Sequence, residues 1–394
     1  MSQSKLDFRS LFLHTWDLAD SGIDAVMGEM ADAGLNTMCF AGTYHSGWFI
    51  HPQSKTRRTF MTEGSVCYFR PQASLYKSTP LKPLVSAICR KKDWLAEAGK
   101  KLDRYGLRLV SWTIGTHNTR LGLAHPLLTQ QNVYGDRIPH ALCPANENVR
   151  AYLTAICRDL ATSYPMWAIQ LESFGWMSIC HGHHHERDLV GLSPLELELL
   201  SLCVCNACTR RATKAGVDVG ATAAAVRAVL DDAFREAPDR PRHHPRTMAE
   251  LEDRSRDLRA FNAWRKRYGD SVILDLKTDA LRGTSCQLLM QSGYDAALAR
   301  RGGVDGFACG AYGLSPREVA RTCRDALRPV PKRWDGLLQC FVRLGNGVPQ
   351  SQRQLGAIVS AVADAGCNGI NFYNRSEAPP KMLGWLRAAL RETM

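Results

Sequence analysis

The sequence contains no apolar run long enough to cross a bilayer, and its first ten residues, MSQSKLDFRS, hold no apolar signal core. These absences exclude a membrane partner and lead us to expect a reducing, cytoplasmic compartment. Internal repeats are also absent, as is any aromatic-plus-basic motif typical of a nucleic-acid-binding domain. We therefore expect no nucleic-acid partner either.

The composition is that of an ordinary globular chain. Of the 394 residues, 45% are hydrophobic and 22% are charged, which excludes wholesale disorder and fibrous repeats. Fifty Lys and Arg against 38 Asp and Glu give a formal net charge of +12, which would suit an anionic ligand or nucleic acid and alone identifies neither. Between Arg210 and Arg267 the basic residues are interleaved with acidic ones, a pattern typical of solvated helix faces.

Short aliphatic runs alternate with amphipathic stretches along the whole chain, the pattern of strand-helix units that feed a parallel sheet. The expected strands are residues 10–16, 36–40, 107–114, 166–171, 286–290, 304–309, 336–342 and 367–373. Eight strands predict an α/β fold, a single (β/α)8 TIM barrel over residues 1–394, with functional groups at the carboxyl ends of its strands. An open doubly wound sheet is the alternative, but no GxGxxG turn follows the first strand.

Two long segments interrupt the alternation. Residues 43–79 form a polar and aromatic loop after the second strand, and residues 173–285 form a long insertion after the fourth. The insertion contains a triplet of cysteines and a run of histidines. We expect it to carry a zinc-binding loop and several helices beside the barrel.

Fourteen cysteines in a reducing compartment form no disulfides, so clustered ones become metal candidates and scattered ones small core residues. Cys203, Cys205 and Cys208 place three thiols within six residues, and tetrahedral zinc requires a fourth ligand. Cys143 precedes the helix that leads to the fourth strand, so the same barrel end brings it near the triplet. Cys180 competes with Cys143, and a group of unrelated buried thiols is the alternative.

The order of these motifs adds a family resemblance. Cys143-Pro-Ala-Asn146, then Val149-Arg150, then a strand that ends in a carboxylate, then Cys-x-Cys-x-x-Cys, resembles the catalytic domain of glycoside hydrolase family 42 β-galactosidases and the hypothetical glycoside hydrolase barrels related to them. The resemblance covers about residues 140–210. It implies structural zinc held by Cys143, Cys203, Cys205 and Cys208, and cleavage of a glycosidic bond in a small sugar or oligosaccharide.

The fourth strand ends Gln170-Leu-Glu172, which places Glu172 at the mouth of the barrel. The resemblance implies that Glu172 is the general acid/base, a role that requires a carboxyl group of raised pKa. A carboxylate that pairs with a barrel arginine is the alternative. An ungapped match to the family's Asn-Glu pair would instead place Glu172 on the Asn and Ser173 on the Glu.

At the seventh strand, where such enzymes carry the nucleophilic Glu, this chain has Gln339-Cys-Phe-Val-Arg343. The other catalytic candidates near strand ends are Asp17, after the first strand, and Glu377, after the eighth. The eighth strand lies across the barrel from the fourth, so a pair of Glu172 and Glu377 would fit the inverting carboxyl separation of roughly 6.5–9.5 Å.

Other polar and aromatic residues at strand ends predict a rim that binds a polyhydroxylated ligand, although each alone is commonly a structural hydrogen-bonder. The predicted substrate-binding residues are His14, Tyr44, His45, His117, Asn118, Arg120, Gln291, Tyr312, Arg343, Tyr373 and Asn374. Arg120 or Arg343 would bind an anionic group such as a uronate. The partner is therefore a carbohydrate substrate, possibly anionic.

The segment Cys180-His181-Gly-His183-His184-His185-Glu186 follows the fourth strand and does not match HExxH. We interpret it as a substrate lid in which His181, His184 and His185 hydrogen-bond sugar hydroxyls. The alternative is a catalytic divalent metal with Glu186 or Asp188 as a carboxylate ligand.

These observations favour a hydrolase of the glycosidase type, with zinc as its structural metal. A metal-dependent sugar lyase or isomerase that uses the histidine loop is the second interpretation. A non-catalytic carbohydrate-binding barrel is the third. The oligomeric state stays open.

Overall fold

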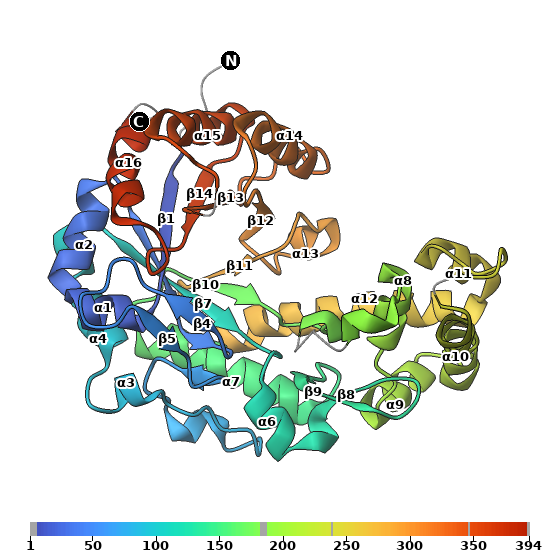
Figure 1. Ribbon diagram of the computed structural model, residues 1–394. Coiled ribbons are helices and arrows are strands. Elements are labelled where there is room, and N and C mark those ends of the chain that lie inside the picture. The colour runs from blue at the N-terminus through green and yellow to red at the C-terminus, as the bar shows by residue number, and fades with distance from the viewer. Residues whose placement is uncertain (1–5, 182–186, 238, 346, 392–394) are drawn as a thin grey trace.

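The computed structural model describes residues 6–181, 187–237, 239–345 and 347–391. Within these residues, eight parallel strands close into one barrel (Figure 1). Each strand is hydrogen-bonded to the next in the order β1, β14, β13, β12, β11, β10, β7, β2. Their bounds are β1 Phe8–Leu13, β2 Thr37–Ala41, β7 Arg108–Ile114, β10 Ala168–Glu172, β11 Gln287–Met290, β12 Gly306–Gly310, β13 Leu337–Arg343 and β14 Gly369–Tyr373. The predicted (β/α)8 barrel is confirmed, and β14 lies across it from β10.

The first strand was predicted to extend to residue 16, and this boundary is wrong. β1 ends at Leu13, and helix α1 (Thr15–Ser21) begins directly after it. The Asp17 carboxylate accepts the backbone N–H of His14 at 2.8 Å, which caps the first turn of the helix. Asp17 therefore lies in a helix rather than at a free strand end.

Helices with one apolar face cover the barrel. In α7 (Glu147–Ser163) the buried residues include Val149, Leu153, Ile156 and Leu160, at the helical spacing. The remaining helices of this layer and its loops are α2 Ile23–Asp32, α3 Ala87–Arg90, α4 Trp94–Gly99, α5 Leu102–Tyr105, α13 Ala296–Arg300, α14 Pro316–Leu327, α15 Gln352–Asp364 and α16 Pro380–Arg391.

The loops that follow β2 and β7 contain small antiparallel sheets. After β2, β3 (Thr43–Tyr44) pairs with β6 (Val66–Cys67), and β4 (Trp48–Ile50) pairs with β5 (Thr59–Met61). A 3-10 turn, η1 (Ala73–Tyr76), ends this segment. After β7 come α6 (Thr119–Ala124), η2 (Pro126–Leu128) and the paired strands β8 (Thr129–Gln131) and β9 (Arg137–Leu142). The β9 strand ends immediately before Cys143.

The segment between β10 and β11 is mainly helical and extends to one side of the barrel (Figure 1). Its elements are η3 Ile179–His181, η4 Arg187–Val190, α8 Pro194–Leu200, α9 Asn206–Lys214, α10 Val219–Glu236, α11 Met248–Arg254, α12 Arg256–Asp275 and the π-helical turn η5 Leu276–Ala280. It has an apolar core of its own, in which Leu199, Leu230 and Phe261 are fully buried. Of the helices described, none has the length and apolar character needed to cross a membrane.

Candidate active site

Glu172 is the last residue of β10 and is held by residues from the strands on either side. The indole Nε1 of Trp112, on β7, donates to Glu172 Oε2. Gln291, just after β11, satisfies both neighbours when its amide nitrogen donates to Glu172 Oε2 (3.1 Å) and its oxygen accepts from Trp112 Nε1 (3.0 Å). The carboxyl group is therefore positioned by two neutral groups rather than by an arginine.

The electrostatics of this position favour a protonated carboxyl group. Burial raises the pKa of Glu172, and the hydrogen bond from Trp112 opposes part of that shift. A carboxyl group with a raised pKa and no paired cation is what general acid catalysis requires. The alternative considered from the sequence, a carboxylate paired with a barrel arginine, does not describe the contacts of Glu172.

Three tyrosines lie around Glu172. The hydroxyls of Tyr44 and Tyr373 are 3.5 Å apart, and the Tyr312 ring lies 5.7 Å from the Tyr373 ring. Burial raises the pKa of each phenol, and the negative charge of Glu172 raises it further. Neutral phenols at the carboxyl ends of strands offer both hydroxyls and ring faces, which suits a sugar. The structure thus brings these three predicted residues together with Glu172.

Glu377 lies close to the same tyrosines but is exposed. Its charge contributes to the raised pKa of Tyr44 and of Tyr373, so it faces the Tyr44–Tyr373 pair from the β14 side. The Asn374 amide donates to Glu377 Oε2 at 2.8 Å, and the Glu377 N–H donates to Asn374 Oδ1 at 2.9 Å. Asn374 therefore orients Glu377 and has little freedom left to bind substrate itself.

Asp17 has a different environment from the other two acidic candidates. It is 4% exposed, and its carboxylate accepts hydrogen bonds from Arg375 (3.1 Å) and Ser376 (2.6 Å), as well as from the His14 backbone. The ion pair joins α1 to the segment after β14 and thereby ties together the first and last strands of the barrel. These contacts give Asp17 a structural role.

His14 is fully buried and stacks on Trp16, with ring centroids 4.3 Å apart. Its Nδ1 shares a 2.9 Å hydrogen bond with the Ser376 hydroxyl, whereas its Nε2 has no partner among the described residues. Burial lowers the pKa of His14 well below its usual range. It therefore contacts Tyr44 as a neutral ring (5.1 Å) and supports the wall of the site from behind.

A group of histidines lies next to this wall. His45 stacks on His117 at 4.5 Å, and His117 contacts His140 at 5.9 Å and His181 at 5.1 Å. Burial lowers the pKa of His117 to about 3, with further lowering by the neighbouring imidazoles. His140 could not be predicted from the sequence, because it lies within β9 and away from any barrel strand end. His184 and His185 lie outside the described residues.

Two predicted rim residues have structural partners instead. The Asn118 side chain accepts from the Leu121 N–H at 2.9 Å and is the N-cap of α6. Arg120 donates to the carbonyls of Glu63 (3.0 Å) and Gly64 (3.3 Å), which holds its guanidinium on the loop after β5. Both side chains, which were predicted to contact the substrate, thus form hydrogen bonds within the loops.

Arg343, at the end of β13, is placed differently. Its guanidinium lies over the ring of Tyr312 at 5.3 Å from the centroid, and its charge lowers the pKa of that phenol, against the larger effect of burial. Among the described residues, Arg343 forms no ion pair. An anionic group bound beside Tyr312 would therefore find a cation that no protein carboxylate neutralises.

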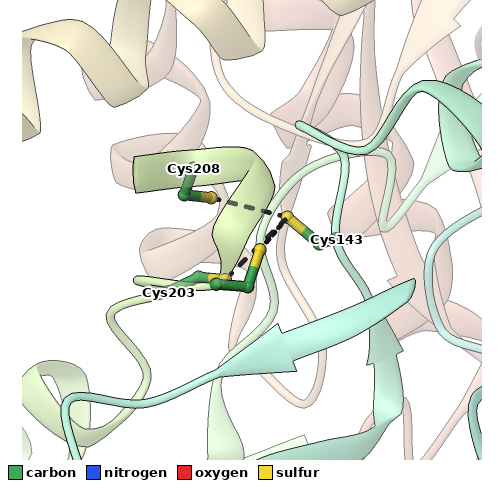
Figure 2. A group of neighbouring side chains, drawn as sticks. Cys143, Cys203 and Cys208 are labelled. Atoms are coloured by element: carbon green, nitrogen blue, oxygen red, sulfur yellow. Dashed lines mark hydrogen bonds between the residues drawn. The ribbon is translucent and has the colours of Figure 1, made fainter. Parts of the chain in front are cut away.

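The four cysteines predicted to bind zinc converge (Figure 2). The Sγ atom of Cys143 lies 3.8 Å from that of Cys203, and 3.5 Å from those of Cys205 and Cys208. Four ligands at the usual Zn–S distance of about 2.3 Å would be about 3.8 Å apart at the corners of a tetrahedron. All four thiols are buried, so the donor set fits a structural zinc site. Cys180 is exposed and does not belong to it.

A partly buried arginine, Arg265, lies beside the same cluster. Burial lowers the pKa of Arg265, and the charges of Cys208, Cys203, Glu198 and Cys143 raise it. Its Nε has no hydrogen-bond partner among the described residues, and its guanidinium lies 5.1 Å from the centroid of Trp176. A desolvated cation is stabilised by nearby anions. Zinc with four thiolates would carry two negative charges and would add to the charge of Glu198 near Arg265.

A hollow of about 510 Å³ lies at the opposite end of the barrel, between Phe8, Trp167 and Trp334. That end carries the amino ends of the strands, where residues of such barrels serve stability rather than function. Glu172 lies at the carboxyl end. The chemistry of the residues, rather than the size of the hollow, therefore selects the candidate site.

No family model and no curated protein matches this chain. Solved structures share its fold. The glycoside hydrolase domain of PgaB from Bordetella bronchiseptica superposes with a TM-score of 0.59 and 12% identity, over 97% of this chain and 98% of that one.

Two longer enzymes also match. The α-L-fucosidase isoenzyme 2 from Paenibacillus thiaminolyticus gives a TM-score of 0.55 and 9% identity, over 98% of this chain and 49% of that one. The β-galactosidase from Bacillus circulans sp. alkalophilus gives 0.54 and 11%, over 99% and 56%. The chain thus spans about half the length of these two. At such identities the likeness shows the fold, a barrel that different glycoside hydrolases share.

Proposed function

We propose that this protein is a glycoside hydrolase-like enzyme that cleaves a glycosidic bond in a small sugar or oligosaccharide. The observation that carries the proposal is Glu172, a carboxyl group with a raised pKa held between Trp112 and Gln291 at the carboxyl end of β10. In its protonated form Glu172 would donate a proton to the leaving oxygen.

Glu377 is the second carboxylate of this proposal. It lies in the segment after β14, the strand opposite β10, and it acts on the same pair of tyrosines as Glu172. In an inverting reaction it would accept a proton from the attacking water while Glu172 protonates the leaving group. Asn374, which donates to Glu377 Oε2, would hold the carboxylate in position.

The substrate-binding surface of the proposal consists of the aromatic and cationic groups around Glu172. Tyr44, Tyr312 and Tyr373 would contact sugar hydroxyls and ring faces, and Arg343 would bind an anionic substituent. His117 and His181, which lie in ring contact, would extend this surface along the mouth of the barrel. No step of the reaction involves the four-cysteine cluster, whose zinc would brace the segment after β10.

The test is a panel of nitrophenyl glycosides, including uronides, with the wild-type protein and the Glu172→Gln variant. We expect one glycoside to be turned over, and the variant to lose about 10²–10⁴-fold in kcat while it still binds the substrate. Glu63→Gln, which alters an exposed carboxylate of the loop after β5, is the matched control. Full turnover by Glu172→Gln would contradict the role given to this residue.

A carbohydrate-binding barrel without turnover is the second candidate. It is favoured by the end of β13, where Arg343 stands and where a retaining glycosidase of the resembling family would carry its nucleophile. Binding of a glycoside that neither the wild type nor any variant cleaves would support this candidate over the enzyme.

A further inference from the structure

A second group of cysteines lies in the other half of the barrel, away from the insertion. Cys309 is on β12, Cys323 on α14 and Cys340 on β13, and Cys367 precedes β14. The sulfur atoms of Cys309, Cys323 and Cys367 all lie within 4.8 Å of one another. The thiol of Cys340 interacts with those of Cys309 and Cys323, so it is the fourth member of the group.

The spacing of these sulfurs is that of a metal site rather than of a disulfide. The Sγ atoms of Cys309 and Cys323 are 4.0 Å apart. A bonded pair would be about 2.05 Å apart, whereas two thiolates on one zinc ion would be about 3.8 Å apart. None of these four cysteines forms a disulfide with another described residue.

The environment of the group differs from that of an isolated core cysteine. Cys39, for example, is a buried thiol that lies 3.9 Å from the amide oxygen of Gln170. In the second group the polar neighbours of Cys309 are three other thiols. Three separate segments contribute sulfurs that lie within 4.8 Å of one another, and Cys340 adds a fourth that interacts with two of them, which packing of small apolar side chains does not require.

We infer that Cys309, Cys323, Cys340 and Cys367 bind a second zinc ion. Soft thiolate ligands in a tetrahedral set select zinc among the common divalent metals, and a set with four protein ligands is a structural site. Three of the proposed ligands are buried and Cys309 is half-buried.

The position of this site suggests what the ion would do. It would cross-link β12, β13 and the start of β14 with α14, which is the part of the barrel that presents Tyr312, Arg343 and Tyr373 at its mouth. The first cysteine group links the insertion to the loop before α7. Two ions would thus brace two separate parts of one chain, and the inference does not depend on the proposed enzymatic function.

The experiment is elemental analysis of the full-length protein after extensive dialysis. We expect two zinc equivalents per chain in the wild type and one in Cys323→Ser. The Cys205→Ser variant should also retain one, because it removes a ligand of the other group. The matched control is Cys157→Ser, since Cys157 and Cys323 are both fully buried thiols on helices of the barrel layer. This control should retain two equivalents.

Other results would overturn the inference. Zinc content that is the same in Cys323→Ser and in the wild type is one such result. Iron in place of zinc, or a Cys309–Cys323 disulfide found by mass spectrometry of the alkylated protein, is another. If Cys323→Ser does not fold, Cys309→Ser replaces it, because the half-buried position of Cys309 tolerates a hydroxyl more readily. Loss of one zinc equivalent from Cys309→Ser would likewise support the second zinc site.

Discussion

The indole N–H of Trp112 donates to the carboxyl group of Glu172, so a residue of β7 acts on the pKa of a residue on β10. The two residues come from neighbouring parallel strands, in which Gln170 pairs with Trp112 and Glu172 with Ile114. Burial favours the neutral carboxyl group, whereas the indole hydrogen bond favours the carboxylate. The pKa of Glu172 thus depends on two opposing effects, and a mutation can remove one without the other.

Trp112→Phe removes only the second effect. Because the hydrogen bond lowers the pKa of Glu172, its loss should raise that pKa further. If the protonated form of Glu172 is the active one, activity falls as the pH rises through this pKa. We therefore expect the alkaline limb of kcat/KM against pH to move to higher pH in the variant. A limb that stays in place, or moves to lower pH, would contradict this role. Phe12→Leu, which alters another ring in contact with Trp112, is the control.

Substitution of Arg343 and substitution of Arg120 should have different effects on the turnover of an anionic sugar. Arg343 forms no ion pair among the described residues, whereas Arg120 donates to two backbone carbonyls. A hydrogen bond to a charged group is worth about 1.5–3 kcal/mol, or roughly 10- to 150-fold in kcat/KM. Arg343→Gln should lower kcat/KM for a uronide by that factor and leave a neutral glycoside unaffected. Arg120→Gln should affect both substrates equally. Equal effects of both variants on both substrates would remove the anionic-sugar hypothesis.

Much of the fold could be predicted from the sequence, because the alternation of strands and helices depends on local hydrophobic patterns. The predicted strand 286–290 became β11 (Gln287–Met290), for example, and 107–114 became β7 (Arg108–Ile114). The end of β1 was missed, because a polar Asp at this point fits both a free strand end and the first turn of a helix. Only the hydrogen bond from the His14 backbone distinguishes the two.

The site was predicted less completely, since its contacts depend on strand register and on residues distant in the sequence. Glu172 could be located from its position at a strand end. Trp112 could not, because it lies inside a strand with no polar motif around it. The second cysteine group shows the same difficulty. Cys309 and Cys340 are opposite each other in the register of β12 and β13, but Cys323 and Cys367 join them only through the packing of α14 and the turn before β14.

Replacing a cysteine of the first group, Cys143, Cys203, Cys205 and Cys208, should destabilise the protein more than replacing an isolated cysteine. If the four thiols bind zinc, Cys205→Ser should release it, and the partly buried Arg265 would lose part of the negative charge around it while Glu198 remains. Loss of a structural metal is among the changes that cost about 4–5 kcal/mol or more. We expect a loss of that size in urea unfolding, together with the loss of one zinc equivalent. Cys180→Ser is the control, because Cys180 is exposed. Similar stability of the two variants would mean that the four thiols hold no ion.

Low pH should break the ion pair between Glu196 and Arg240. Glu196, in the first turn of α8, is fully buried, and Arg240 donates to both of its oxygens (2.7 and 2.8 Å). Burial alone would raise the pKa of Glu196, but the bonds from Arg240 and Ser193 lower it from 4.5 to about 2. A carboxyl group with a lowered pKa stabilises the fold above its unfolded pKa, and this contribution is lost as the pH falls toward the folded value. The wild type should therefore lose stability between pH 4.5 and about 2.

Glu196→Gln should be less stable than the wild type by about 3–5 kcal/mol at pH 7, and this difference should become smaller as the pH falls. Urea midpoints of both proteins at several pH values measure this difference, and one that stays constant with pH would show that the ion pair with Arg240 is not its source.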